Sequence, residues 1–320
     1  MSKRGASPPP GGALIKRARS GSPAPNTQIA ISSSNNEREQ GLIRTIKRTS
    51  SLEAPIISLS ALWRTYSPNT NYGLIANLHK APILDLQWSL ASQVLYTVSA
   101  DHTLSVTDLT TGGAGVELVV TGADDGTVRV WEGGDEGPKT PVSVFELGCP
   151  VTSVCWSADG SSIYAGALDN EIHVLDFRKN EEVYTLMGHT DTPTSLSLSP
   201  NGNFLLSPSF SSQTIIHDVR PFSPSPNRIH RVLMGAPAGF EHTLLRGAWS
   251  KDDDGRRVGV GGADRTVCIW EVESGKVLYK LPGHKGTVTA VDFHPKEPIV
   301  VTGSKDATML LGEIEPTIGA

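Results

Sequence analysis

The chain has 320 residues, 38% of them hydrophobic and 19% charged, with 32 glycines and 22 prolines, which is typical of a turn-rich globular protein. Its three cysteines form no CxxC pair and predict no disulfide framework, and no apolar run reaches the roughly 18 residues of a membrane-spanning helix. Residues 1–50 carry a net charge of +7 and the remainder −12, so the body of the protein is a poor platform for nucleic-acid phosphates.

Residues 1–50 are rich in Ser, Pro, Gly and Asn and offer little apolar area, so we predict a disordered tail there and a folded domain over 51–320. The tail contains a split basic cluster that resembles a nuclear import signal, made of Lys3, Arg4, Lys16, Arg17 and Arg19. The alternative is a solvated basic tail without a targeting role. We expect a nuclear protein whose contact with RNA is indirect or made through this tail.

The rest of the chain repeats a short unit. Its segments are "SADHTLSVTD" (99–108), "GADDGTVRVWE" (122–132), "ALDNEIHVLD" (167–176), "SFSSQTIIHD" (209–218), "GADRTVCIWE" (262–271) and "SKDATMLLGE" (304–313). In five of them an Asp stands seven residues before the closing acidic residue, and Ser211 takes that place in the fourth. Upstream of five of these positions lies a bulky residue within a strand-like run, and three units also carry a histidine 22 residues upstream: His79, His189 and His284.

This pattern resembles the WD40 repeat family, whose units start with GH, end with WD and form four-stranded propeller blades. The resemblance implies an all-β propeller in which the His, the turn Asp, a Ser and the Trp of a blade form a buried hydrogen-bonded network. The residues expected in such networks are His79, Ser99, Asp101, Asp125, Trp131, Asp169, His189, Asp264, Trp270, His284, Ser304 and Asp306.

The family has seven blades, whereas this chain encodes five complete three-strand sets and one partial set. Parts of the first and third repeats are missing, about 50 residues in all, which indicates an incorrect gene structure or a shortened isoform. The final unit supplies only three strands. Because proteins avoid unpaired sheet edges, we expect the strand-like run at 54–60 to complete it beside residues 309–314.

Several stretches resemble a narrower group within the family, the WD-repeat propeller subunits of the spliceosomal U5 particle. They include "DVRPFSP" (218–224), "LLRGAWS" (244–250) and "LYKLPGHKGTVTAVDFHPKEPIV" (278–300). The resemblance implies a protein-interaction scaffold in pre-mRNA splicing that binds the large central scaffold protein of that particle. Candidate contacts are Arg220, Pro221 and Phe222, since Arg and aromatic residues are enriched at interfaces; an ordinary loop between strands is the alternative.

We expect no enzymatic activity. His284, Ser304 and Asp306 have the residue types of a hydrolase triad, but their spacing recurs in other units, as a structural network would and a single catalytic site would not. The nine histidines show no metal-ligand spacing, and we predict no metal, cofactor, small-molecule substrate or membrane partner.

A second hypothesis rests on "LDFR" (175–178) and "HDVR" (217–220). These resemble the WDxR box by which some propellers dock on the adaptor of cullin-type ubiquitin ligases, although Trp is replaced in both. The resemblance implies a substrate receptor of such a ligase as the alternative function.

Overall fold

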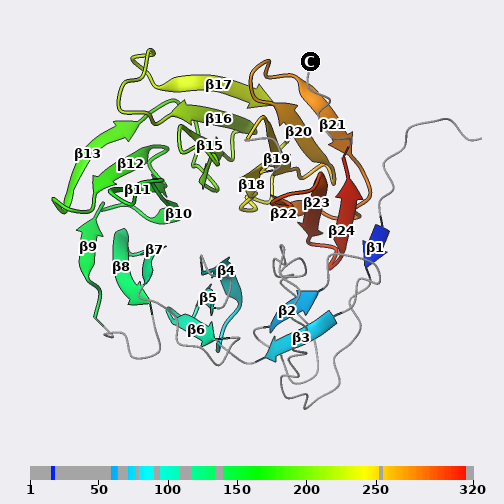
Figure 1. The fold of residues 1–320 in the computed structure, drawn as a ribbon, viewed down its shortest axis with the longest axis horizontal. Helices are drawn as coiled ribbons and strands as arrows, with labels where there is room; N and C mark the ends of the chain where they lie inside the picture. The colour runs from blue at the N-terminus through cyan, green and yellow to red at the C-terminus, as the bar shows by residue number, and fades with distance from the viewer. Residues whose placement is uncertain are drawn as a thin grey trace, which may run out of the picture.

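The protein is built from antiparallel sheets that follow one another around a central space (Figure 1). The computed structural model describes residues 16–18, 59–63, 71–76, 79–89, 94–108, 117–133, 140–251 and 255–314. All regular elements in these residues are β-strands, and no helix among them is long and apolar enough to cross a membrane. This confirms the expected all-β propeller architecture.

Three consecutive sheets have four strands each, paired in chain order from the innermost strand to the rim (Figure 1). Their strands are β10 (Val151–Trp156), β11 (Ser162–Ala167), β12 (Ile172–Asp176), β13 (Glu181–Leu186), β14 (Ser197–Leu198), β15 (Phe204–Pro208), β16 (Gln213–Asp218), β17 (Ile229–Met234), β18 (Gly247–Trp249), β19 (Arg257–Gly261), β20 (Val267–Glu271) and β21 (Val277–Leu281). The middle strands are buried on both faces, as all five residues of β19 illustrate, which explains their continuous apolar runs.

The repeated Asp marks a tight turn between the second and third strands of each unit. The residue that follows it has a positive φ, between +59° and +79°, in all six units: His102, Gly126, Asn170, Ser212, Arg265 and Ala307. An Asp can stabilise such a turn because its carboxylate accepts the backbone N–H two residues on. Asp101, for example, accepts from the N–H of Thr103 at 3.1 Å.

The last sheet contains β22 (Val288–Phe293), β23 (Ile299–Ser304) and β24 (Met309–Glu313), and an N-terminal strand completes it as expected. That strand is β1 (Lys16–Ala18), with Arg17 opposite Leu310, so the proposed segment 54–60 was wrong. Leu59 and Ser60 instead begin β2 (Leu59–Trp63), which pairs with β3 (Asn71–Ala76), while 54–58 lie outside the described residues. The open edge of β24 can form backbone hydrogen bonds with any extended segment, whatever its side chains. Strand propensity alone therefore did not identify which segment pairs with it.

Two neighbouring sheets have three described strands each. They are β4 (Ile83–Trp88), β5 (Val94–Ser99) and β6 (Leu104–Asp108), followed by β7 (Glu117–Gly122), β8 (Thr127–Gly133) and β9 (Ser143–Glu146). The Asp125 turn joins β7 to β8 just as the Asp101 turn joins β5 to β6, so β7 is a second strand. The described residues therefore hold no first strand for the β7–β9 sheet and no fourth strand for the β4–β6 sheet. They contain five complete three-strand sets and the partial β7–β9 set, and the two-stranded β2–β3 sheet is a further partial set that the sequence did not predict.

The core lies between the sheets, in four apolar clusters that each join one sheet to the next. One cluster, for example, packs Leu206, Ile216 and Leu233 of the β14–β17 sheet against Trp249 and Trp270 of the β18–β21 sheet. The other three join β7–β9 to β10–β13, β10–β13 to β14–β17, and β18–β21 to β22–β24. The sheets that share a cluster are consecutive in the chain, so each buries apolar side chains against the sheet that precedes or follows it.

Gly261 shows how closely neighbouring sheets approach. A Cβ at this position in β19 would lie 2.2 Å from the carbonyl oxygen of Val288 in β22, a backbone atom that cannot rotate away. Gly303 occupies a similar place in β23, yet a Cβ there would meet only the Cβ of Ala290, at 3.9 Å.

We therefore predict that Gly261→Ala destabilises the protein by about 1–3 kcal/mol or more, because the two sheets must separate to admit the methyl group. Gly303→Ala is the matched control and should change the free energy of unfolding by less than about 1 kcal/mol. Urea titration followed by tryptophan fluorescence measures both. Equal stability of the two variants would contradict the close approach.

Candidate protein-interaction site

Two blades contain nearly identical polar networks. His79 is buried and contacts Thr97 Oγ1 through Nε2 at 2.9 Å and Thr103 Oγ1 through Nδ1 at 2.8 Å, while Asp101 accepts from the Lys80 N–H at 2.7 Å. His284 in the last blade repeats these contacts with the residues that stand at the same spacing, Thr302, Thr308, Asp306 and Lys285. The networks tie the loop before the first strand to the turn between the second and third.

Burial opposes ionisation of Asp306, but hydrogen bonds from Thr308 and from the Lys285 N–H outweigh it and lower its pKa from 3.8 to about 2. The carboxylate is therefore charged at neutral pH and holds both N–H groups. His284 contacts the hydroxyls of Thr302 and Thr308, and the Ser304 hydroxyl accepts from the Asp306 N–H at 3.2 Å. Ser304 therefore helps to hold the turn through Asp306.

The blade of β14–β17 has a reduced network. His189 Nε2 contacts Ser207 Oγ at 2.6 Å, but its Nδ1 has no hydrogen-bond partner among the described residues. His217 occupies the Trp position of this unit, is 0% exposed, and neither of its ring nitrogens has a partner in the described part of the chain. The two imidazole rings lie 5.7 Å apart, centre to centre.

The other predicted network residues make different contacts. Trp131 donates to Thr121 Oγ1 at 2.8 Å, whereas Trp270 donates to the Met234 carbonyl of the preceding blade at 3.0 Å. Asp125 pairs with Arg129 at 2.6 Å and Asp264 with Lys280 at 2.8 Å. Asp169 faces a thiol and an imidazole, which are described below.

Sequence reasoning singled out Ser99 and Ser304 but missed Thr97, Ser207 and Thr302, the hydroxyl groups that contact the three histidines. These three stand 18 residues after their histidine in every case. Of the three units without such a histidine, two have the apolar residues Ala165 and Val260 at the matching place, and the third has Thr121, whose hydroxyl accepts from Trp131 instead.

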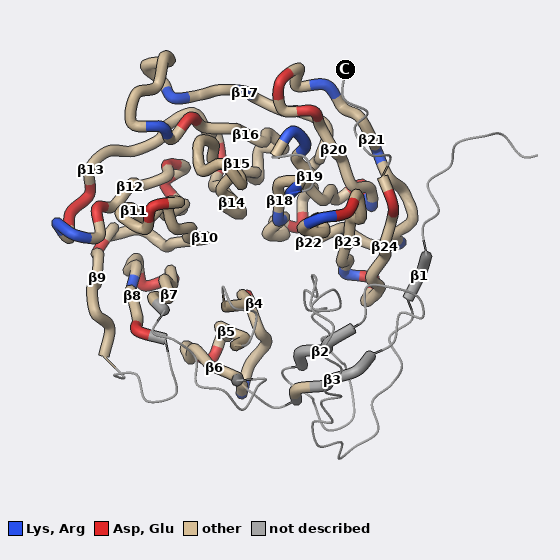
Figure 2. The backbone as a smooth tube through the Cα atoms, in the orientation of Figure 1, with Lys and Arg blue, Asp and Glu red and all other residues tan. Residues whose placement is uncertain are grey.

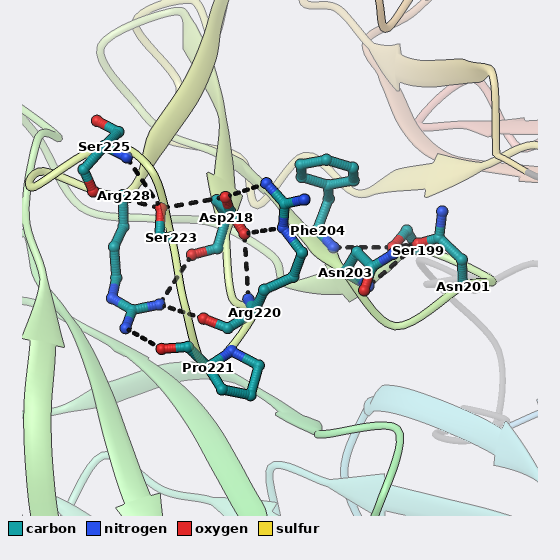
Figure 3. Close-up of polar contacts among 10 residues, drawn as sticks. All are labelled: Ser199, Asn201, Asn203, Phe204, Asp218, Arg220, Pro221, Ser223, Ser225 and Arg228. Carbon is teal, nitrogen blue, oxygen red and sulfur yellow. Dashed lines mark hydrogen bonds and ion pairs between the residues drawn. The ribbon is translucent and has the colours of Figure 1, made fainter.

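The loop between β16 and β17 holds the predicted contact residues, of which Figure 3 shows Arg220 and Pro221. Asp218 is 2% exposed and accepts two hydrogen bonds from the Arg220 guanidinium, at 2.8 and 2.6 Å. These bonds lower the pKa of Asp218 to about 2. Arg220 Cζ also lies 5.6 Å from the centre of the Phe204 ring, so the arginine is held on two sides.

The same loop is fixed from its other end. Arg228 donates to the carbonyl oxygens of Arg220 at 2.7 Å and of Pro221 at 3.4 Å, and Ser223 donates to Asp218 at 3.1 Å (Figure 3). Phe222, between these anchors, is 94% exposed. The arrangement presents one aromatic side chain on an ordered backbone, which reduces the conformational entropy that a partner must overcome.

Other predicted residues lie elsewhere. Lys16 and Arg17 belong to β1, while Lys3, Arg4 and Arg19 lie outside the described residues. Arg178 of "LDFR" is exposed next to Asp176, which caps the turn by accepting the Arg178 N–H at 2.9 Å. Lys and Arg positions are interspersed with Asp and Glu positions along the described backbone (Figure 2).

Comparison with known proteins identifies the family. The description "WD domain, G-beta repeat" matches residues 112–132, 139–176, 180–218 and 275–311. The U5 small nuclear ribonucleoprotein 40 kDa protein of Dictyostelium discoideum is 35% identical over 336 positions, covering 90% of this chain and 92% of that protein. The chain belongs to the WD40 family of the U5 40 kDa proteins.

Another member, pre-mRNA-splicing factor cwf17 of Schizosaccharomyces pombe, is 36% identical over 272 residues, covering 79% of this chain and 78% of that protein. The alignment with the Dictyostelium protein spans more positions than the 320 residues of this chain, so some of that relative has no counterpart here. This agrees with the missing parts of the first and third repeats.

The fold is shared more widely than the sequence. The β-propeller domain of Cps50 (Swd1) from Myceliophthora thermophila superposes with a TM-score of 0.68 over 86% of this chain and 98% of that domain, at 14% identity. That likeness supports the propeller fold and carries no information about function. In this chain the His–Thr–Asp networks link the loop before the first strand to the turn between the second and third strands.

The buried histidine pair predicts an acid-sensitive fold. Burial lowers the pKa of His189 from 6.5 to about 4, and burial together with repulsion from His189 lowers that of His217 to about 3. Below pH 6.5 the unfolded chain binds protons that the folded chain does not, so this stability is present above pH 6.5 and is lost as the pH falls towards 4.

The free energy of unfolding of the wild type should fall between pH 7.5 and 5. We predict that it falls by about 2 kcal/mol less in His217→Leu, since one histidine contributes about 1.4 kcal/mol per pH unit. The exposed control His102→Asn, at a positive φ that Asn tolerates, should keep the wild-type slope. Urea titrations at several pH values measure the slopes. An unchanged slope in His217→Leu would refute the assignment.

Proposed function

We propose that this chain is a non-catalytic subunit of the spliceosomal U5 particle in the nucleus, where it acts in pre-mRNA splicing by binding other proteins. The observation that carries the proposal is the 35% identity to a U5 40 kDa protein over 90% of this chain and 92% of that relative. The large central scaffold protein of the particle is the partner that we expect.

The chemistry of the described residues supports a docking role. The His, Thr and Asp side chains that could suggest catalysis bind one another and the backbone within blades. Positively and negatively charged residues are interspersed along the described backbone (Figure 2), which suits contact with a protein better than contact with an RNA backbone.

The β16–β17 loop is the contact site that we favour. Phe222 and Pro221 are exposed, while Arg220 is held by Asp218 with its side chain 40% accessible. Few residues dominate most interfaces, and rigid aromatic and arginine side chains are frequent among them. Phe222 would enter a pocket of the partner with Arg220 beside it.

The ubiquitin-ligase alternative gains less support from the geometry. The arginine of "HDVR", Arg220, forms two hydrogen bonds with its own Asp218, so docking through it would have to share or break that pair. A ligase adaptor recovered without splicing factors in the following experiment would favour this alternative.

The test is purification of the tagged full-length chain from nuclear extract of its own cells. We expect U5 small nuclear RNA and the central scaffold protein in the wild-type eluate, and about tenfold less of both with Phe222→Ala, because a buried aromatic anchor contributes on the order of 1.4 kcal/mol or more. Phe240→Ala, equally exposed in another loop, is the matched control. Absence of U5 RNA and U5 proteins from the wild-type eluate would overturn the proposal.

Nuclear entry is tested separately. The triple variant Lys3→Ala, Arg4→Ala and Arg19→Ala removes basic residues that lie outside β1, so the pairing of β1 with β24 is retained. Fluorescence microscopy should show this variant shifted to the cytoplasm relative to the wild type. Undiminished nuclear accumulation would show that the tail is not the import signal.

A further inference from the structure

The turn aspartates share one contact and differ in the other. In four blades Oδ1 accepts the N–H of a threonine two residues on, and in the β10–β13 blade Asp169 Oδ1 accepts that of Glu171 at 3.1 Å. The second oxygen meets a backbone N–H at Asp101 and Asp306 and a cationic side chain at Asp125 and Asp264.

Asp169 Oδ2 has a different environment. It lies 3.5 Å from Cys149 Sγ, in the loop before β10, and 3.0 Å from His173 Nε2, on β12. The three ligand-type atoms all lie within 4.8 Å of one another. No other blade has a thiol, an imidazole and a carboxylate together at its turn among the described residues.

These separations suit a tetrahedral metal. Zinc bond lengths place sulfur, nitrogen and oxygen ligands about 3.4–3.6 Å apart, so the sulfur–oxygen and nitrogen–oxygen pairs are already near that geometry. The sulfur and nitrogen atoms lie within 4.8 Å of each other, and the cysteine lies in the loop between β9 and β10.

The surroundings of His173 also suit a metal ligand. Its Nδ1 contacts Glu182 Oε1 of β13 at 3.1 Å, and a carboxylate in this position orients an imidazole and strengthens its bond to a metal. His173 is buried, Cys149 half-buried and Asp169 exposed, so an ion can enter from solvent and a water can take the fourth position.

We propose that Cys149, Asp169 and His173 form a zinc-binding site, with Glu182 holding His173 in place. A thiolate and a carboxylate together neutralise the charge of a divalent ion. The mixed sulfur, nitrogen and oxygen set favours Zn²⁺ over Mg²⁺ or Ca²⁺, which prefer oxygen ligands alone. Sequence spacing did not reveal the site because its residues are 20 and 4 positions apart and meet only through the blade.

Co²⁺ serves as the spectroscopic probe for the purified, metal-stripped full-length chain. We expect saturation at one ion per chain with a thiolate-to-cobalt absorption band, displacement by Zn²⁺, and loss of the band in Cys149→Ser. Cys155→Ser and Cys268→Ser are the matched controls and should keep it. Glu182→Gln should weaken Zn²⁺ affinity about 10- to 100-fold without removing the band.

A second readout separates the site from a folding defect. Zn²⁺ should raise the melting temperature of the wild type and of Cys155→Ser, but not of Cys149→Ser or His173→Gln. Absence of a thiolate band in the wild type, persistence of the band in Cys149→Ser, or unchanged affinity in His173→Gln would each overturn the proposal and show adventitious binding only.

Discussion

The structure depends on the burial of apolar sheet faces against one another around the ring. The four apolar clusters all lie between consecutive sheets, and the largest side chains in them, such as Trp270 and Phe293, are almost completely buried. The sheets can approach this closely only where side chains are small, as Gly259 beside Phe293 illustrates. A blade is therefore stable through its neighbours, and strands can be missing from one blade without loss of the packing between others.

The polar networks fix the relative positions of loops and strands, which apolar packing alone does not determine. An apolar face tolerates some sliding, but His79 and His284 each contact one hydroxyl on the second strand and one in the turn that follows it, while the Asp of that turn holds the loop. The β14–β17 blade has neither the Asp nor the Trp, and its two buried imidazoles have ring nitrogens without a partner among the described residues. The β10–β13 blade lacks the histidine, and the second oxygen of Asp169 faces Cys149 and His173. The repeat thus supplies a constant turn, and the residues around it vary.

The regular part of this architecture could be predicted from local sequence. The Asp turn has a local cause, since its carboxylate binds the N–H two residues on, and every turn position lay where the spacing placed it. Contacts between distant segments were harder. The strand that completes the last sheet was assigned to 54–60 rather than 16–18, because any extended segment can satisfy a backbone edge. Likewise Cys149, Asp169 and His173 carry no motif, and only the register of β11 with β12 and the course of the preceding loop bring them together.

The central claim is that each sheet is stabilised by its two neighbours. Hydrogen–deuterium exchange measured along the whole chain tests it most directly. The amides of β11, β15 and β19, whose sheets have a described apolar cluster on both sides, should exchange slowest and with similar free energies of opening. In Gly261→Ala, whose methyl group must separate the β18–β21 and β22–β24 sheets, the amides of both β19 and β23 should exchange faster, while those of β11 should keep their protection. Loss of protection confined to β19 would contradict the account.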